Sequence, residues 1–305
     1  ETGAIELETG RGVQGSGGDI SLTVGSGNSG DGGDVLVAAG ETTDRASVGG
    51  LVSITAGVGS STDSADGGDG GAVVVTAGEA LGGNTTTDVG GDVLVTAGAA
   101  ASAFGGGIHL LSGRSNATSS GEVSITTADA GAEGVSGGVF VTTGDSTAGE
   151  TGAIELETGR GVQGSGGDIS LTVGSGNSGD GGDVLVAAGE TTDRASVGGL
   201  VSITAGVGSS TDSADGGDGG AVVVTAGEAL GGNTTTDVGG DVLVTAGAAA
   251  SAFGGGIHLL SGRSNATSSG EVSITTADAG AEGVSGGVFV TTGDSTAGET
   301  GAIEL

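Results

Sequence analysis

Short apolar runs alternate with polar, glycine-rich stretches along the whole chain. Residues 90–98, Gly-Gly-Asp-Val-Leu-Val-Thr-Ala-Gly, show the pattern: two glycines open the run, β-branched residues fill it and one glycine closes it. The apolar residues Val93 and Val95 lie two positions apart, which is the periodicity of a strand and not of a helix. The flanking glycines are expected to supply the positive φ angles that sharp corners need. The pattern therefore predicts a short strand with a corner at each end.

Eight relatives of this module lie in residues 1–149, which are therefore expected to contain nine strands. The apolar pairs of these relatives are Ile5 and Leu7, Ile20 and Leu22, Val35 and Val37, Val52 and Ile54, Val73 and Val75, Ile108 and Leu110, Val123 and Ile125, and Val139 and Val141. Residues 1–149 recur without a substitution as residues 150–298, and residues 299–305 begin a third copy. We therefore predict two identical repeat copies and the start of a third, as a window on a longer array.

The connections between the predicted strands have no apolar face, so the strands are expected to face one another across a core. Burying the aspartates of the connections without partners would be costly. Nine strands divide evenly into coils of three, and this grouping keeps every copy in register and stacks like residues on one another. The sequence therefore predicts an all-β fold, a parallel β-solenoid (β-helix) with nine strands per 149-residue repeat and three strands per coil. The alternative is a glycine-rich disordered chain, although disordered chains lack such regular pairs of Val, Ile and Leu.

One outward face of this predicted coil would carry an apolar stripe. We call this set the lateral stripe, and its members are Leu36, Leu94, Phe140, Leu185, Leu243 and Phe289. Continuous exposed apolar patches mark contacts, so the stripe is expected to pack against a neighbouring chain or against the chain's own long connections. The alternative is that the inward and outward positions are exchanged and that these residues belong to the core.

Composition narrows the classes of partner. The chain has 75 glycines among 305 residues, no Cys, Pro, Met, Trp or Tyr, and a net charge of −32 with only six Lys and Arg residues. With so few cations the chain cannot neutralise phosphates, which argues against nucleic acid as a partner. No apolar run reaches 18 residues, so no membrane span is expected. The negative charge favours solubility and cation binding.

The best candidate metal site is an acidic cluster in the longest connection, formed by Asp63, Asp66 and Asp69. Clustered carboxylates with glycines between them can wrap a hard cation such as Ca²⁺. Residues 67–75 also resemble one nonapeptide of the calcium-binding RTX repeats, although Ala72 stands where that motif has a liganding Asp. The alternative interpretation is a solvated acidic loop. We expect no other cofactor.

Two glycosylation sequons in each copy place Asn84, Asn116, Asn233 and Asn265 as candidate sites of modification. Such sequons favour an extracellular or cell-surface location. The alternative is that they arise by chance in a chain rich in Ser and Thr.

An enzymatic role is not expected. His109 has no second His, no Cys and no paired carboxylate near it in the sequence, and no nucleophile–base pair is present. A ladder of Thr23, Thr76 and Thr126 would permit an ice-binding surface, since regular Thr arrays suit ordered water. The usual Thr-x-Thr pairing is missing, however, and β-propensity also explains these threonines.

The recurring modules Gly-Gly-Asp-Val-Leu-Val-Thr-Ala-Gly and Gly-Gly-Leu-Val-Ser-Ile-Thr-Ala-Gly resemble the tandem repeats of extracellular β-solenoid proteins, such as bacterial adhesins and algal surface fibres. This resemblance implies a structural filament or stalk whose length is set by copy number. Self-association into filaments or bundles is the expected partnership. The alternatives are an ice-binding protein or a calcium-stabilised adhesin stalk module.

Overall fold

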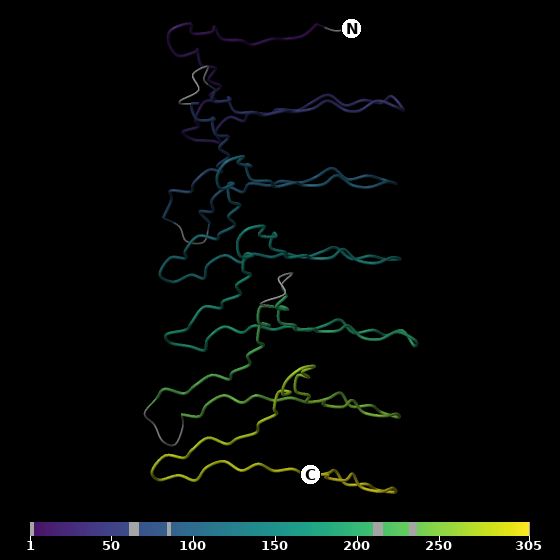
Figure 1. Ribbon diagram of the computed structural model, residues 1–305. Coiled ribbons are helices and arrows are strands. Elements are labelled where there is room, and N and C mark those ends of the chain that lie inside the picture. The colour runs from purple at the N-terminus through teal and green to yellow at the C-terminus, as the bar shows by residue number, and fades with distance from the viewer. Residues whose placement is uncertain (1–2, 61–66, 84–86, 210–215, 232–236, 305) are drawn as a thin grey trace. The chain divides into compact units, whose positions relative to one another are not determined.

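The predicted β-solenoid is wrong. The computed structural model describes residues 3–60, 67–83, 87–209, 216–231 and 237–304. Within these ranges the chain forms neither helix nor strand, and no residue, apolar or polar, is buried. The expected nine strands per copy, the three-strand coils and the core between them are therefore absent from the described part of the chain (Figure 1).

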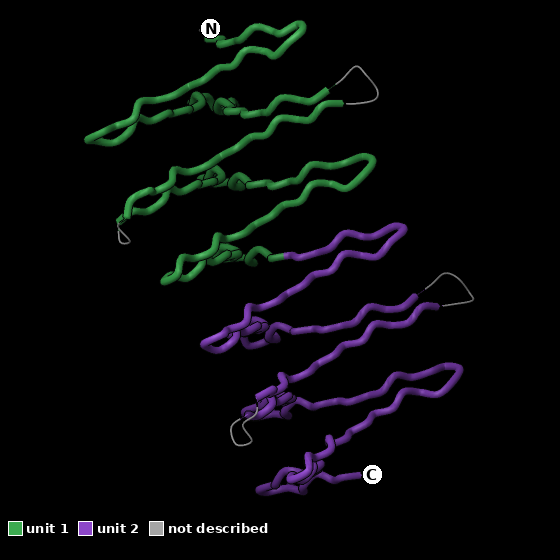
Figure 2. The backbone as a smooth tube through the Cα atoms, turned by 90° about the vertical axis from the view of Figure 1, so that its left-hand side faces the viewer, with its two compact units in different colours: residues 1–154 green, residues 155–305 purple. Residues whose placement is uncertain are grey.

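The chain divides into two units, Glu1–Ile154 and Glu155–Leu305, which Figure 2 distinguishes by colour. The two copies of the sequence meet slightly earlier, between Gly149 and Glu150. In each unit the backbone runs through extended stretches that are joined by turns (Figure 2). The same local geometry recurs in both units, as the backbone hydrogen bonds show.

Many of the turns between the described segments are closed by one backbone hydrogen bond between two glycines. The N–H of Gly91 donates to the carbonyl oxygen of Gly78 at 2.9 Å, and the N–H of Gly106 donates to that of Gly98 at 2.8 Å. In the second copy, Gly240 donates to Gly227 at 2.9 Å. The donor is the second glycine of a Gly-Gly pair, except at Gly121 and Gly270, which follow a serine, and the acceptor is the glycine that ends the preceding apolar run. We call these contacts closing bonds.

The closing bonds divide the chain into segments of constant length and connections of variable length. Where a segment has a closing bond at each end, the donor glycine and the next acceptor glycine are seven positions apart, as from Gly71 to Gly78 and from Gly91 to Gly98. From acceptor to donor the distance is 8 positions at Gly98–Gly106 and 14 at Gly57–Gly71. These segments therefore have one length, whereas the connections between them vary in length.

Close approach of the backbone explains why the donor position is glycine. A Cβ on Gly50 would lie 3.0 Å from the nitrogen of Gly40 and 3.1 Å from the Cβ of Ala39, whereas a Cβ on Gly40 would meet nothing within 4 Å. Small side chains precede the acceptor for the same reason, and Ala56, Ala77 and Ala97 are among the few half-covered residues of the chain. The Gly-Gly pairs thus permit the turn to close.

Positive φ angles play a smaller part than the sequence predicts. Among the described glycines only Gly68 and its equivalent Gly217 have a positive φ, at 60° and 67°. Both lie in the longest connection of their copy. The close approach of two backbones, and not left-handed geometry, favours glycine at the donor positions. At acceptor positions such as Gly40 and Gly98 a Cβ would meet nothing within 4 Å, so neither reason applies there.

A solenoid requires neighbouring strands to be bonded along their length at about 4.8 Å. Here the closing bonds join successive segments at their ends, and no backbone bond continues from them along the described segments. The apolar side chains therefore stay in solvent. Val93 remains 56% exposed and Leu94 87% exposed, so the alternation of the sequence survives as a difference in exposure, without a core on either side.

Candidate functional site

The acidic cluster lies mostly outside the described residues. Asp63 and Asp66 fall in residues 61–66, which the structure does not describe, and Asp69 is exposed. In the described ranges no group of three or more His, Asp or Glu residues is arranged to hold a metal ion. The calcium site therefore remains a prediction from sequence.

A different carboxylate is held in a defined turn. The hydroxyl of Ser196 donates to Oδ2 of Asp193 at 2.6 Å, and the N–H of Asp193 donates to the hydroxyl oxygen of Thr191 at 3.2 Å. Together with the N–H groups of Arg194 and Ala195, the Ser196 hydroxyl lowers the pKa of Asp193 below its ordinary value. The equivalent turn in the first copy has the Ser47–Asp44 bond, also at 2.6 Å.

Two of the four candidate glycosylation sites can be placed. Asn116 and Asn265 are exposed, whereas Asn84 and Asn233 lie outside the described residues. The turn at Asn116 is held by Ser115, whose hydroxyl oxygen accepts the N–H groups of Ala117 at 3.2 Å and Thr118 at 2.9 Å. The Ser115 and Thr118 hydroxyls also lie 3.1 Å apart. The sequon thus sits in an ordered and accessible turn.

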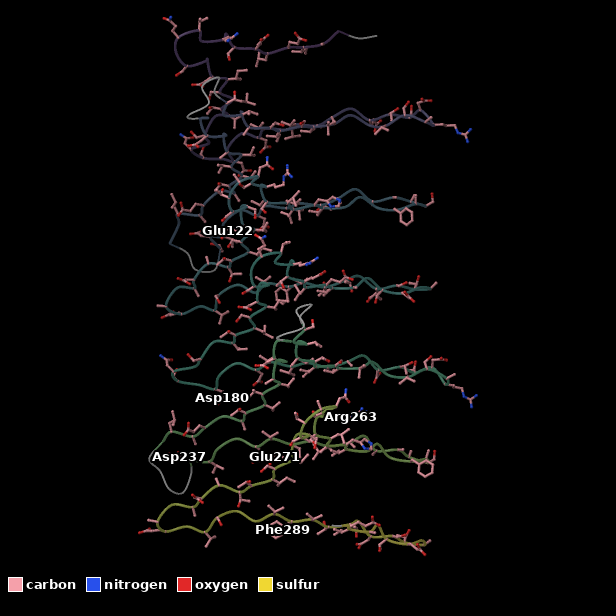
Figure 3. The ribbon with its side chains drawn as sticks, viewed as in Figure 1. Glu122, Asp180, Asp237, Arg263, Glu271 and Phe289 are labelled. Carbon is pink, nitrogen blue, oxygen red and sulfur yellow. The ribbon has the colours of Figure 1, made fainter. Side chains whose placement is uncertain are left out.

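The turn at Asn265 repeats this geometry and adds one contact. The oxygen of Ser264 accepts the N–H groups of Ala266 at 3.3 Å and Thr267 at 2.9 Å. The guanidinium of Arg263, labelled in Figure 3, donates to Oδ1 of Asn265 at 2.6 Å. The amide nitrogen of Asn265, which a glycan would modify, takes no part in that bond. Glycosylation at these positions stays a prediction.

The members of the lateral stripe are exposed. The four leucines lie three residues after a donor glycine, whereas Phe140 and Phe289 follow Gly137 and Gly286, which form no closing bond with a described residue. The ring of Phe140 folds back over its own segment: a Cβ on Gly138 would lie 3.0 Å from the ring atoms Cε2 and Cζ. Phe289, labelled in Figure 3, lies over Gly287 in the same way. Such packing of an aromatic ring on a glycine shields the backbone locally, but it leaves the outer face of the ring open.

The remaining candidates stay separate from one another. His109 leans over Gly107, whose Cβ would lie 3.0 Å from its Nε2 atom. Thr23 and Thr126 each lie near a serine on the same side of the segment, with hydroxyl oxygens 3.5 Å and 3.4 Å apart respectively. No pocket is found in the part of the chain that the structure describes. None of the described residues belongs to a helix long and apolar enough to cross a membrane.

The chain matches no protein-family model, and no curated protein or solved structure is similar to it.

The sequence analysis missed the closing bonds and the hydroxyl-held turns. Both have a signal in the sequence. The closing bonds correspond to a glycine pair whose second member is followed by another glycine seven positions later, as at Gly71 and Gly78. The hydroxyl-held turns correspond to local Ser, Thr and Asp spacings such as Asp44 and Ser47, which are typical of side chains that bond to neighbouring backbone.

Proposed function

We propose that this chain is a structural extracellular protein, an extended filament or stalk whose length is set by the number of repeat copies. It acts by spanning distance and not by catalysis. One observation carries the proposal: six of the seven closing bonds of the first copy recur at equivalent positions of the second copy with the same residue separations, the exception being Gly18 to Gly10. Gly71 donates to Gly57 and Gly220 donates to Gly206, both at 2.9 Å. Each copy therefore adds the same set of segments and connections.

The composition supports this role. A net charge of −32 repels segments of the same chain from one another and opposes compaction. Exact repetition over 149 residues suits a spacer, because a spacer gains length from each added copy while a catalytic site gains nothing from duplication. The exposed sequons at Asn116 and Asn265 fit a cell-surface or extracellular location.

The experiment measures how the size of the molecule grows with copy number. Chains of one, two and four copies are purified, and the maximum dimension of each is measured by small-angle X-ray scattering at low protein concentration. A stalk doubles its maximum dimension with each doubling. A flexible coil grows only about 1.5-fold and a compact protein only about 1.3-fold per doubling. Growth at either of these lower rates overturns the proposal.

The location is tested separately on the source cells. Antibodies against the repeat should label the surface of intact cells without permeabilisation. Labelling that requires permeabilisation would contradict an extracellular role.

A further inference from the structure

The chain leaves far more surface in solvent than a compact protein of its mass. Its accessible surface is 29801 Å². A compact monomer of 27.6 kDa exposes about 11,000 Å² and the fully unfolded chain about 40,000 Å². The single chain therefore covers only a minor part of the surface that folding normally removes from water. The uncovered surface includes the apolar side chains of every segment.

One segment combines this exposure with the most apolar sequence of the repeat. Residues 72–77, Ala-Val-Val-Val-Thr-Ala, lie between Gly71 and Gly78 and contain no charge and no proline. Val73, Val74 and Val75 are 55%, 80% and 73% exposed. Short segments of high β-propensity, low charge and no proline are the ones that pair with identical segments of other chains.

The backbone of this segment is also open. No hydrogen bond to another described residue is made by the N–H or C=O groups of residues 72–77, since the closing bonds involve only the glycines at either end. Extended backbone with unpaired donors and acceptors is a template for pairing with a further chain. The same holds for residues 221–226 in the second copy, which have the same sequence.

Charge lies beside the segment and not within it. Asp69 precedes the segment and Glu79 follows it, and both are exposed. When two identical segments pair, these carboxylates of the two chains approach one another and repel. Salt screens this repulsion, with a Debye length of about 8 Å at 0.15 M and about 3 Å at 1 M. Pairing through this segment should therefore strengthen as salt is added.

We propose that residues 72–77 and 221–226 form a docking surface for a second copy of this chain, on which the same segment of that copy pairs edge to edge. The inference rests on the proposed structural role and specifies how stalks associate laterally. The partner is a second copy because each chain offers the matching sequence twice. Two weak contacts in one chain act together through effective concentration, which compensates for the small area of a six-residue segment.

The test compares two matched double variants by sedimentation equilibrium at low and high salt. The first, Val74→Asp with Val223→Asp, places charge in the docking surface. The second, Val135→Asp with Val284→Asp, makes the same chemical change at connection residues that are each 96% exposed. We expect the unchanged chain to associate, and more strongly at 1 M salt. The first variant should weaken association at least about tenfold, or about 1.4 kcal/mol, and the control should change it little.

Three results would overturn the inference. The unchanged chain could remain monomeric at both salt concentrations; the two variants could weaken association equally; or neither could weaken it. The docking variants leave the closing bonds untouched, so their maximum dimension as dilute monomers should equal that of the unchanged chain. Failure of length to scale with copy number would count against the proposed stalk, whereas loss of association without loss of scaling would count against the docking surface alone.

Discussion

Gly50 donates its backbone N–H to the carbonyl oxygen of Gly40 at 2.8 Å, and the α-carbon of Gly50 lies against Ala39. The two glycines are bonded to each other but differ in their surroundings. Gly50 has no room for a side chain, while Gly40 has open space where its Cβ would lie. This difference makes the two ends of one bond a matched pair for mutation.

The first prediction concerns this pair. Gly50→Ala should weaken the closing bond, because the added Cβ must displace the backbone of Gly40. Gly40→Ala should leave the bond intact or strengthen it by about 0.4–1 kcal/mol, because alanine restricts the unfolded chain. Amide hydrogen exchange at residue 50 provides the measurement, and Gly50→Ala should lower protection there at least about fivefold, for a cost above about 1 kcal/mol. Equal protection in both variants would refute the close-approach argument.

The second prediction concerns the turn at Asp193. Ser196→Ala removes the hydroxyl that donates to the Asp193 carboxylate, so the pKa of Asp193 should rise towards its ordinary value. A titration of the Asp193 carboxyl carbon by NMR measures this shift, with Thr191→Val as a control that leaves the Ser196 bond in place. If the Ser196 variant titrates like the unchanged chain, the hydroxyl is not the cause.

The sign of the pH effect follows from the lowered pKa. The folded turn binds a proton less readily than the unfolded chain, so the stabilisation of the turn is present above the unfolded value of about 3.9. It is lost as the pH falls through the lowered pKa. The chemical shifts of Arg194 and Ala195 should therefore move towards those of the unfolded chain as the pH falls below the unfolded value.

The third prediction concerns the lateral stripe. If the stripe is a contact with a neighbouring chain, Leu94→Asp with Leu243→Asp should disperse bundles of the chain, because each change places a charge in that contact. Leu81→Asp with Leu230→Asp is the matched control, since Leu81 is 85% and Leu94 87% exposed but Leu81 lies in a connection. Electron microscopy of concentrated samples distinguishes bundles from single filaments. Bundles that survive the Leu94 change would exclude the stripe as a lateral contact.

The alternation of exposure along the segments could be predicted from the sequence, whereas the predicted strands and their assembly into coils are wrong for the described residues. The alternation of Val35, Leu36 and Val37 indicates extended backbone, and exposure does alternate there, at 50%, 87% and 73%. The alternation of residues along a segment determines only which side chains lie on the same face of that segment. Whether a second backbone lies alongside is decided by contacts between residues far apart in sequence. In this chain the closing bonds bring successive segments together only at their ends.

The candidate sites also divide into those that a local sequence motif reveals and those that it does not. The sequons at Asn116 and Asn265 are local and were found from sequence alone. The bond between Ser196 and Asp193 is also local, but it depends on the orientation of a hydroxyl that no periodicity reveals. The acidic cluster of Asp63 and Asp66 falls outside the described residues, so the structure does not decide it.

The absence of buried residues from the described ranges has a consequence for cleavage of the chain by proteases. A digestive enzyme normally waits for a protein to open before it can cut the chain. Here the cleavable backbone is accessible from the start, so packing gives little protection. The narrow choice of amino acids limits cleavage instead: six Lys and Arg residues, four Phe, and no Tyr, Trp or Met leave few sites for enzymes that cut after basic or aromatic residues.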